Sequence, residues 1–534
     1  MRNSVRYDPS IAQAFLKSGL WAEEDTLSRW LARAAAEAGD RPALVMSEDI
    51  ITYREFAGRV ARAAQMLLRI GVEAGDVVSV QLPNIPEFMI LYLAIARIGA
   101  VLSTLHMPYR AQESQPLLAH SGAKVFVGLS HYKDYSPVSD LLRLKDKLPH
   151  LLSIIAVGED IPGTMRYADL EDAEPISASH PEPDSSEPFL LLFTSGTTAS
   201  PKAVPLAYQV TLGNARLVAR ELGFSRNDRI LSAAPFTHLL ALYGIHLALE
   251  CAAATVLLPT FTPAELAAKI AQSRPSVVLS APAHMANMAH LGLLDSTDFS
   301  SLRLVISSGA PCPPDLIRLM ISHMRGGHFV QQWGMTELQA GTFTRPFDPP
   351  TIATTTAGRA CPGVEIRVTD VEGAPLPADV EGELQVRGSP VFRQYFCNEE
   401  VNQEAFTADG WFRTGDLASL DAQGNLRITG RTKNIINRGG VKYNPTDLEV
   451  LILKHPDVRE AAIIAFPDPL LGEKACCFIV PKDNRIPSLE EICAYLVANG
   501  VSKPKLPERL EVLEEMPMTP TRKVIRAKLK AMLA

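Results

Sequence analysis

A segment rich in hydroxyl side chains follows an apolar run that begins at residue 190. Residues 190–204 have the sequence LLLFTSGTTASPKAV. Its residues of interest are the glycine Gly196 and the polar residues Thr194, Ser195, Thr197, Thr198 and Lys202. Such a loop can present hydroxyl and backbone N–H donors to phosphate oxygens, and the lysine adds a positive charge. The Walker A pattern G-x-x-x-x-G-K-[ST] is absent. Because a loop of serine, threonine and glycine is usually an ordinary polar turn, phosphate binding is a hypothesis that other motifs must support.

Three further segments contain charged residues that could bind a metal ion or a substrate. FVQQWGMTEL (329–338) contains Glu337, and one carboxylate together with substrate phosphates is the usual way to hold Mg²⁺. In GWFRTGDLASLDAQGNLRITGRTKNIINRGGVKYNP (410–445), Asp416 can accept two hydroxyl hydrogens, as a vicinal diol supplies. Near the C-terminus, MPMTPTRKVIRAKLK (516–530) contains Lys523. A lone glutamate is usually solvated and a lysine near the C-terminus usually lies on a helix surface, so these segments matter only in combination.

In chain order, these segments and LVISSGAPCPP (304–314) closely resemble the motifs of the adenylate-forming superfamily. This superfamily includes acyl-CoA synthetases, aryl-acid adenylating enzymes, peptide-synthetase adenylation domains and firefly luciferase. The five matching strings span residues 190 to 530, so the resemblance covers nearly the whole chain. One motif alone is moderate support for a function, whereas five in order are specific.

The resemblance implies a role for each matching residue. The implied nucleotide-binding residues are Thr194, Ser195, Gly196, Thr197, Thr198, Lys202, Gly309, Ala310, Pro311, Gln332, Trp333, Gly334, Met335, Thr336, Asp416, Arg431 and Lys523. Among them, Thr336 is implied to contact the α-phosphate, Asp416 the ribose hydroxyls and Trp333 the adenine. Glu337 is the implied Mg²⁺ ligand. The implied catalytic residues are Lys523, Thr336, Glu337 and the hinge residue Lys433.

Four positions differ from the superfamily pattern. Ala199 and Ala203 stand where glycine is usual, Arg522 replaces a glycine and Asn434 replaces an acidic residue. Alanine is tolerated where φ is negative, whereas a position that needs positive φ is strained without glycine. Three of these differences, at residues 199, 203 and 522, support an alternative hypothesis, in which the chain is a nucleotide-binding protein that has lost catalysis.

The implied chemistry has two half-reactions. The acid's carboxylate attacks the α-phosphorus of ATP and pyrophosphate leaves, while Lys523, Lys202, Arg431 and Mg²⁺ provide positive charge. The C-terminal part then rotates about Lys433, and a thiol displaces AMP from the acyl-adenylate. With CoA as the thiol, the protein is an ATP-dependent carboxylic acid:CoA ligase. The alternative acceptor is the thiol of a carrier protein.

The residues implied to bind the acid are mostly apolar. They are His238, Leu239, Leu240, Tyr243, Ser308, Gly334 and Met335, while Gly439 and Gly440 are implied to line the CoA channel. The set contains no Lys, Arg or Asp, which predicts an acid with an uncharged tail. Leu239 follows the pocket histidine where enzymes for hydroxybenzoates often have asparagine. We therefore predict an aryl, alicyclic or medium aliphatic acid.

The pattern of elements predicts an α/β protein. Over the first 430 residues, short apolar runs such as VVSVQL (77–82) alternate with helical patterns such as EFMILYLAIARIGA (87–100), which predicts parallel sheets covered by helices. Residues 358–430 contain strands with alternating patterns and turns, which predicts a small antiparallel β unit. We predict an ATP- and acid-binding domain at 1–430 and a mobile C-terminal α+β domain at 431–534 that carries Lys523.

Length, charge and composition indicate the number of domains, the kinds of partner and the cellular compartment to expect. A length of 534 residues favours more than one domain, and a net charge of −7 gives no general affinity for nucleic acid. The seven scattered cysteines predict reduced thiols in a cytoplasmic protein. The apolar stretch 239–258 is long enough to span a bilayer, but it contains His246 and Glu250. We therefore predict a buried helix and a core strand there, and no membrane span.

Overall fold

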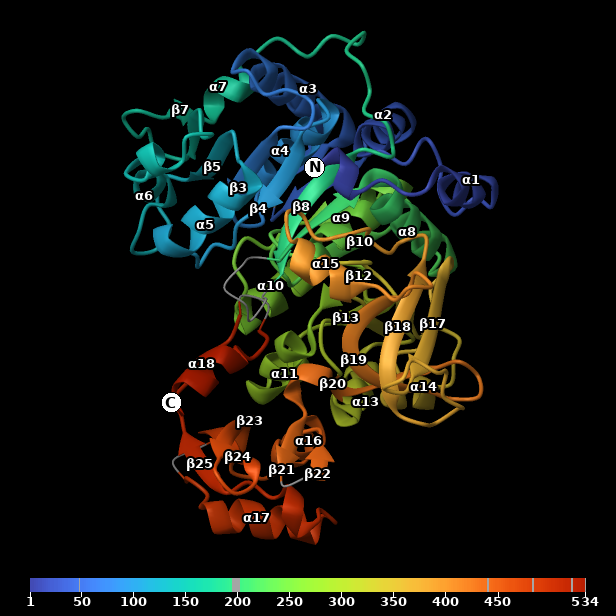
Figure 1. Cartoon of the computed structure of the whole chain (residues 1–534). Coiled ribbons are helices and arrows are strands. Elements are labelled where there is room, and N and C mark those ends of the chain that lie inside the picture. The colour runs from blue at the N-terminus through green and yellow to red at the C-terminus, as the bar shows by residue number, and fades with distance from the viewer. Residues whose placement is uncertain (48, 195–201, 439–440, 483–484, 520–521, 534) are drawn as a thin grey trace. The chain divides into compact units, whose positions relative to one another are not determined.

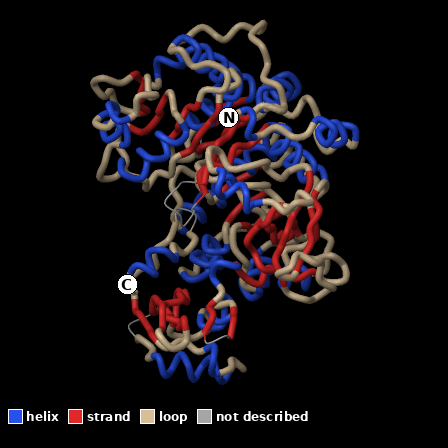
Figure 2. The backbone as a smooth tube through the Cα atoms, in the orientation of Figure 1, coloured by secondary structure: helices blue, strands red, loops and turns tan. Residues whose placement is uncertain are grey.

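The computed structural model describes residues 1–534 except 48, 195–201, 439–440, 483–484, 520–521 and 534 (Figure 1). Contacts between residues divide the chain into two compact units. The first unit comprises Met1–Glu365 and Arg387–Gly410, and the second comprises Ile366–Val386 and Trp411–Ala534. Helices and strands occur throughout both units (Figure 2), which confirms the predicted α/β class.

A seven-stranded sheet forms from the described residues of the first unit, in the order β7-β6-β5-β3-β4-β8-β9. Every neighbouring pair is parallel except β8 and β9. Its strands are β3 (Val77–Gln81), β4 (Val101–Thr104), β5 (Val125–Leu129), β6 (Ser153–Val157), β7 (Met165–Arg166), β8 (Pro188–Thr194) and β9 (Lys202–Ala207). The predicted strand VVSVQ is β3 and is buried at every position, as expected for a parallel strand covered on both faces.

A second sheet of nine strands, again counted over the described residues, has the order β16-β15-β14-β13-β12-β10-β11-β1-β2. The strands from β14 to β1 are parallel to their neighbours, and antiparallel strands close both ends. Its strands are β1 (Pro42–Met46), β2 (Asp49–Thr52), β10 (Arg229–Ser232), β11 (Ala254–Val256), β12 (Val277–Ser280), β13 (Leu304–Ser308), β14 (His328–Trp333), β15 (Thr342–Phe343) and β16 (Arg359–Ala360). The predicted strands at 276–282 and 303–309 are confirmed as β12 and β13.

Helices connect the strands and cover the sheets. The α-helices of the first unit are α1 (Pro9–Lys17), α2 (Leu27–Ala38), α3 (Tyr53–Arg69), α4 (Pro86–Arg97), α5 (Ala111–Ser121), α6 (Pro137–Leu142), α7 (Ala168–Glu171), α8 (Tyr208–Glu221), α9 (Leu239–Cys251), α10 (Pro263–Ser273), α11 (Pro282–His290), α12 (Leu293–Ser296), α13 (Pro314–His323), α14 (Pro350–Thr355) and α15 (Glu399–Ala405). Local chemistry sets where they begin. In α10, for example, the Thr262 side chain accepts the N–H of Glu265, and Pro263 occupies the first position of the helix.

The apolar stretch 239–258 is a buried helix followed by a core strand, as predicted. It forms α9 and β11, and His246 is 0% exposed within α9. The carboxylate of Glu250, which is partly buried, lies 2.6 Å from the Arg33 guanidinium, so this charge is paired. No helix in the described part of the chain is both long and apolar enough to cross a membrane. All seven cysteines are described, and each is a free thiol.

Two sheets contain most of the strands in the described part of the second unit. The four-stranded sheet has the order β17 (Val364–Thr369), β18 (Gly382–Gly388), β19 (Phe412–Leu420) and β20 (Leu426–Arg431). It is the β unit predicted from residues 358–430. The five-stranded sheet contains β21 (Ile436–Arg438), β22 (Val441–Tyr443), β23 (Val458–Asp468), β24 (Gly472–Pro481) and β25 (Arg509–Val512).

The described residues of the second unit also form three α-helices. They are α16 (Thr446–Ile452), α17 (Leu489–Ala498) and α18 (Arg526–Ala531). Helix α17 begins with a capping box, in which Ser488 and Glu491 each accept the backbone N–H of the other. The predicted domain boundary between residues 430 and 431 falls at the end of β20, inside the second unit. The division at this point stays a prediction.

Candidate active site

The segments predicted to bind the acid and the nucleotide follow parallel strands of the nine-stranded sheet. His238 ends the loop after β10, Gly309 follows β13 and Gly334 follows β14. Because β10, β12, β13 and β14 are parallel, their carboxyl ends meet at one edge, where α/β proteins usually bind ligands. Gly309 has φ +94°, a conformation that glycine adopts without strain. Ala310 and Pro311 are exposed beside it. The fold therefore gathers three of the predicted segments at one sheet edge.

The seven-stranded sheet brings its own carboxyl edge to the same place. Asn84, which follows β3, donates to the carbonyl of Ala234 at 3.0 Å and accepts the N–H of Phe236 at 2.6 Å. His106, which follows β4, has its Nδ1 2.8 Å from the hydroxyl of Thr237. Burial lowers the pKa of His106 to about 4, so its ring is neutral near pH 7. The loop after β10 is thus tied to both sheets, and β8 ends at this shared edge because it is parallel to β4.

The predicted phosphate loop starts and ends in an antiparallel pair of strands. Thr194 at the end of β8 is the register partner of Lys202 at the start of β9. The Thr194 hydroxyl donates to the carbonyl of Lys202 at 3.4 Å. The intervening predicted residues Ser195, Gly196, Thr197 and Thr198 lie outside the described residues, as does Ala199. Ala203 is buried within β9, and it does not have positive φ, so alanine there is not strained.

Tyr395 lies between the charged residues that the sequence assigned to phosphate and Mg²⁺. Its hydroxyl donates to the Glu337 carboxylate at 2.8 Å, and the Lys202 ammonium lies 5.1 Å from the centroid of its ring, within cation–π range. Glu337 and Tyr395 are each 5% exposed. The backbone holds the same pairing, since the N–H of Phe392 donates to the carbonyl of Glu337 at 2.7 Å. Sequence reasoning missed Tyr395, because the run VFRQYF has the composition of a core segment.

Glu337 lies in a tight turn that joins β14 to β15, here called the motif loop (residues 334–341). A Cβ atom on Gly334 would lie 1.9 Å from the carbonyl oxygen of Gln339, and one on Gly341 would lie 2.4 Å from the Trp333 ring. Glycine is therefore required at both positions. Gln339 has φ +66°, and its N–H donates to the carbonyl of Met335 at 2.8 Å. The motif loop is closed on itself, with its glycines packed against their neighbours.

The residues predicted to bind the acid differ in exposure. His238, Leu240, Gly334 and Met335 are partly exposed. Leu239, Tyr243 and Ser308 are 4%, 1% and 5% exposed, respectively. The ring of His238 also caps α9, because its Nδ1 accepts the N–H of Leu240 at 3.2 Å. The first turn of α9 and the start of the motif loop therefore provide the accessible apolar surface of this set, and Gln332 is buried beside them in β14.

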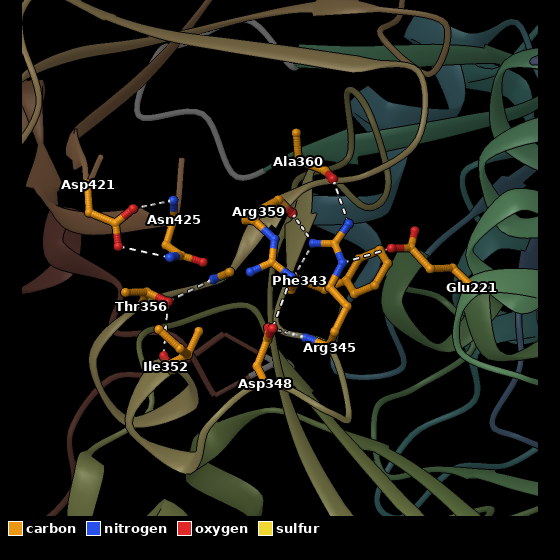
Figure 3. A network of polar contacts seen from close by, with 11 residues as sticks. Glu221, Phe343, Arg345, Asp348, Ile352, Thr356, Arg359, Ala360, Asp421 and Asn425 are labelled. Atoms are coloured by element: carbon orange, nitrogen blue, oxygen red, sulfur yellow. Dashed lines mark hydrogen bonds and ion pairs between the residues drawn. The ribbon is translucent and has the colours of Figure 1, made fainter. Parts of the chain in front are cut away.

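Arg345 holds the two short strands that follow the motif loop (Figure 3). Its guanidinium donates to the carbonyls of Phe343, Arg359 and Ala360 at 2.7, 2.7 and 2.8 Å. It also pairs with the carboxylate of Glu221 at 2.8 Å. This arginine stabilises β15 and β16 next to β14. Sequence reasoning missed it, since Glu221 is 124 positions away in the chain.

The second unit brings together two residues that were assigned to the ribose. Asp416 in β19 and Arg431 in β20 are register partners, and their Oδ1 and Nε atoms lie 2.7 Å apart. Asp416 is 3% exposed, and its N–H donates to the Thr414 hydroxyl at 3.0 Å. Lys433 follows in a short 3₁₀-helix (Thr432–Asn434) and is exposed. Gly439 and Gly440 lie outside the described residues.

The turn before Lys523 gives a physical reason why glycine is usual at the position of Arg522. The Thr519 N–H donates to the carbonyl of Lys523 at 2.7 Å, the Thr519 hydroxyl accepts the N–H of Lys523 at 3.0 Å, and Arg522 has φ +62°. Arg522 thus occupies a left-handed position, which favours glycine. Lys523 is exposed at the end of this turn. In the same unit, burial raises the pKa of Glu460, and the charge of Arg522 opposes this rise.

Comparison with known proteins gives matches along nearly the whole chain. A family model described as AMP-binding enzyme matches residues 31–396, and one described as AMP-binding enzyme C-terminal domain matches residues 447–523. The chain is 31% identical to a medium-chain fatty-acid–CoA ligase of Escherichia coli, over 98% of this chain and 93% of that protein. It is 32% identical to a salicyl-AMP ligase / salicyl-S-ArCP synthetase of Mycobacterium tuberculosis, over 97% of this chain and 93% of that protein.

A solved structure supports the same relationship. The apo structure of MbtA from Mycobacterium smegmatis superimposes with a TM-score of 0.75, at 30% identity and over 99% of each chain. The two model matches fall on either side of β20, which ends at Arg431. The first match contains the sheet edges, the motif loop and Tyr395, and the second contains the turn that ends at Lys523.

Proposed function

The chain belongs to the AMP-binding enzyme family, and from this premise we propose that it is an ATP-dependent carboxylic acid:CoA ligase. It would convert an acid and ATP to acyl-AMP and pyrophosphate, and then acyl-AMP and CoA to acyl-CoA and AMP. The observation that carries the proposal is the grouping of Lys202, Tyr395 and Glu337 within one unit. This grouping places a cation and a carboxylate next to the strands that hold the predicted phosphate loop.

In the first half-reaction, the protein has to bring two anions together. A carboxylate oxygen of the acid attacks the α-phosphorus of ATP, and pyrophosphate leaves as that bond breaks. We propose that Lys202 and the hydroxyl loop hold the departing phosphates, that Thr336 contacts the α-phosphate, and that Lys523 stabilises the reacting carboxylate. Positive charge and fixed donors at these points lower the barrier, because negative charge accumulates in the transition state. No covalent nucleophile from the protein takes part.

The residues at the motif loop suit a magnesium ion. Mg²⁺ prefers oxygen ligands and is usually held by one or two carboxylates and the substrate phosphates. Glu337 supplies such a carboxylate, while the described residues contain no group of three or more His, Cys, Asp or Glu side chains that could hold a metal ion. We propose that Glu337 and ATP hold Mg²⁺ together. When bound, the ion neutralises charge on the phosphates.

In the second half-reaction, the thiolate of CoA attacks the acyl carbonyl and AMP leaves. We propose that the domain at 431–534 rotates about Lys433, which withdraws Lys523 and brings Gly439 and Gly440 to the CoA channel. Asp416 and Arg431 would hold the ribose through their paired side chains. Their cross-strand register fixes the carboxylate and the guanidinium relative to each other, which suits the recognition of a diol next to a phosphate.

The acid is proposed to carry an uncharged aryl, alicyclic or medium aliphatic tail. Leu240 and Met335 offer apolar surface, and a buried charge without a partner is unfavourable in such surroundings. The named activities of the relatives cover both aliphatic and aryl acids. The side chains of Leu240 and Met335 can therefore discriminate by bulk and not by charge.

A panel of acids tests this function directly. The chain is incubated with ATP, Mg²⁺ and each of several benzoates, alicyclic acids and straight-chain acids, and pyrophosphate release is measured with and without CoA. Acid-dependent pyrophosphate release followed by CoA-dependent AMP release is the expected result. Thioester formation on carrier proteins but not on CoA would assign the alternative acceptor, as the name of the Mycobacterium tuberculosis relative includes such an activity. If none of the acids in the panel leads to pyrophosphate release, the result would support a protein that has lost catalysis.

A further inference from the structure

A buried chain of hydrogen bonds ends on the motif loop. The hydroxyl of Tyr92 in α4 lies 2.7 Å from Nε2 of His246 in α9, and Nδ1 of His246 lies 3.0 Å from Oε1 of Gln339. The amide nitrogen of Gln339 then donates to the carbonyl of Thr211 at 3.0 Å and to Oδ1 of Asn214 at 3.1 Å. Tyr92 and His246 are 0% exposed, and Gln339 and Asn214 are 6% and 2% exposed. Every member belongs to the first unit.

The far end of this chain reaches the backbone of the motif loop. Asn214 in α8 donates from Nδ2 to the carbonyl of Ala340 at 3.0 Å, and its Oδ1 accepts the N–H of Ala340 at 3.3 Å. The Asn214 side chain therefore binds both the backbone carbonyl and the backbone N–H of Ala340. Gln339 is held by two residues. Its side-chain oxygen contacts His246, and its backbone N–H donates to the carbonyl of Met335.

With a neutral His246 ring, one arrangement of protons satisfies all these groups. The two partners of the Gln339 amide nitrogen are acceptors, so the atom that faces His246 is the carbonyl oxygen. His246 must then donate from Nδ1 and accept at Nε2, where the Tyr92 hydroxyl supplies the proton. The ring is neutral in this arrangement. Burial lowers the pKa of His246 to about 4, although the hydrogen bond to Gln339 opposes this shift, so the neutral ring is the form present near pH 7.

The backbone of Gln339 shows why the motif loop needs support. Its φ of +66° is a left-handed conformation, which costs a residue with a side chain on the order of 1–2 kcal/mol. Its carbonyl oxygen lies so close to Gly334 that no Cβ fits there. A strained turn persists only where its surroundings determine it. The side-chain bonds of Gln339 provide that determination, two residues after Glu337.

We propose that His246 and Gln339 are positioning residues for the motif loop, holding Glu337 and Met335 in place for Mg·ATP and the acid. This inference rests on the proposed function. The residues act through the loop and do not contact the reacting atoms. A change in such outer supports of a metal-binding side chain typically lowers metal affinity or activity by about 10- to 100-fold.

Three variants and one matched control test the proposal. Gln339→Leu removes the side-chain hydrogen bonds at similar volume, and Gln339→Gly removes them without backbone strain. His246→Asn keeps an amide N–H that can replace Nδ1–H as the donor to Gln339. The control is Tyr208→Phe, because Tyr208 lies in the same aromatic cluster, with its ring 4.3 Å from that of Phe189. Its hydroxyl donates to the carbonyl of Ala96 at 2.9 Å, away from the motif loop.

The readouts are the Mg²⁺ concentration that gives half-maximal pyrophosphate release, the affinity for Mg·ATP by titration calorimetry, and the melting temperature. Both Gln339 variants should raise the Mg²⁺ requirement and weaken Mg·ATP binding by about 10-fold, whereas His246→Asn, which keeps a donor to Gln339, should stay close to the wild type in both readouts. Tyr208→Phe should lower the melting temperature with both Mg²⁺ readouts unchanged.

Each outcome bears on the inference. Unchanged Mg²⁺ readouts in Gln339→Leu and Gln339→Gly would overturn it, as would an equal shift in Tyr208→Phe. Calorimetry separates this failure from failure of the proposed function, since binding does not require an acid. If the wild-type chain binds Mg·ATP but no acid releases pyrophosphate, the function fails and the binding comparison still decides the role of Gln339. Absence of Mg·ATP binding by the wild-type chain would overturn both.

Discussion

Replacing Tyr395 by phenylalanine removes one hydroxyl group and leaves the ring in place. The ring contacts are expected to survive, namely the 4.8 Å edge-on packing with Phe392 and the position of Lys202 over its face. What is lost is the hydrogen bond from the hydroxyl to the Glu337 carboxylate, which is 2.8 Å long with both residues 5% exposed. Hydrogen bonds to charged groups contribute about 1.5–3 kcal/mol. Since about 1.4 kcal/mol is a factor of ten, Mg²⁺ should be needed at about 10- to 100-fold higher concentration.

The assay is pyrophosphate release at saturating acid and ATP, titrated with free Mg²⁺. The matched control is Tyr53→Phe, because Tyr53 is 1% exposed and its hydroxyl donates to the carbonyl of Ala253 at 2.6 Å, outside the candidate site. Both variants should lose stability to urea, Tyr53→Phe by about 1 kcal/mol and Tyr395→Phe by about 1.5–3 kcal/mol, whereas only Tyr395→Phe should shift the Mg²⁺ titration. A Tyr395→Phe enzyme that reaches half its maximal rate at the wild-type Mg²⁺ concentration would refute the assignment of Tyr395 and Glu337.

Four further changes test other parts of the site. Lys523→Ala should slow adenylate formation by at least roughly 10²-fold, the scale for one preorganised electrostatic donor, and leave thioester formation from supplied acyl-AMP nearly unchanged in single-turnover measurements; an equal loss in both would contradict the assignment. Arg522→Gly should be more stable to urea than Arg522→Ala by about 1 kcal/mol, because both lose the side chain and only alanine is strained at φ +62°; equal stabilities would show that strain is absent. Leu240→Ala or Met335→Ala should change relative kcat/KM among acids of different bulk, by about 1–3 kcal/mol per methylene in an apolar pocket, with KM for ATP constant; an unmoved preference places the pocket elsewhere. His246 has a pKa lowered from 6.5 to about 4, so the unfolded chain binds a proton that the folded chain does not, and stability should fall by about 2 kcal/mol between pH 7.5 and pH 5; His246→Asn should remove this part of the acid sensitivity, and identical pH profiles would contradict it.

The sequence predicted the elements whose signals are local. VVSVQ became β3 because β-branched residues suit a strand buried on both faces, and the helical pattern that follows became α4. Glu337 and Asp416 were identified as candidates because their motifs combine a specific string with a specific order along the chain. Gly309 was identified in the same way, and its positive φ gives a physical reason for glycine there.

The supports of the site could not be predicted, because their partners are distant in the chain. Tyr395 and Glu337 are 58 positions apart, and His246 and Gln339 are 93 apart. A tyrosine in an aromatic run and a histidine in an apolar helix both have the appearance of core residues, and only the tertiary path shows what their polar atoms contact. The backbone at Arg522 is similar, because the sequence shows an arginine where glycine is usual but not the sign of φ.

Glu337 is supported both at its carboxylate and through the backbone of the motif loop. We relate this double support to the small number of protein ligands proposed for the metal ion. A site with several carboxylates fixes an ion by coordination geometry alone, since each ligand restrains the others. With Glu337 as the single proposed ligand, the place of the ion depends on how well one side chain and one loop are fixed. Tyr395 restrains the carboxylate itself, and Gln339 restrains the backbone two residues later. Catalytic groups need to be held within about 0.5 Å of their productive positions, and a turn with a left-handed glutamine would not keep that precision without the buried bonds behind it.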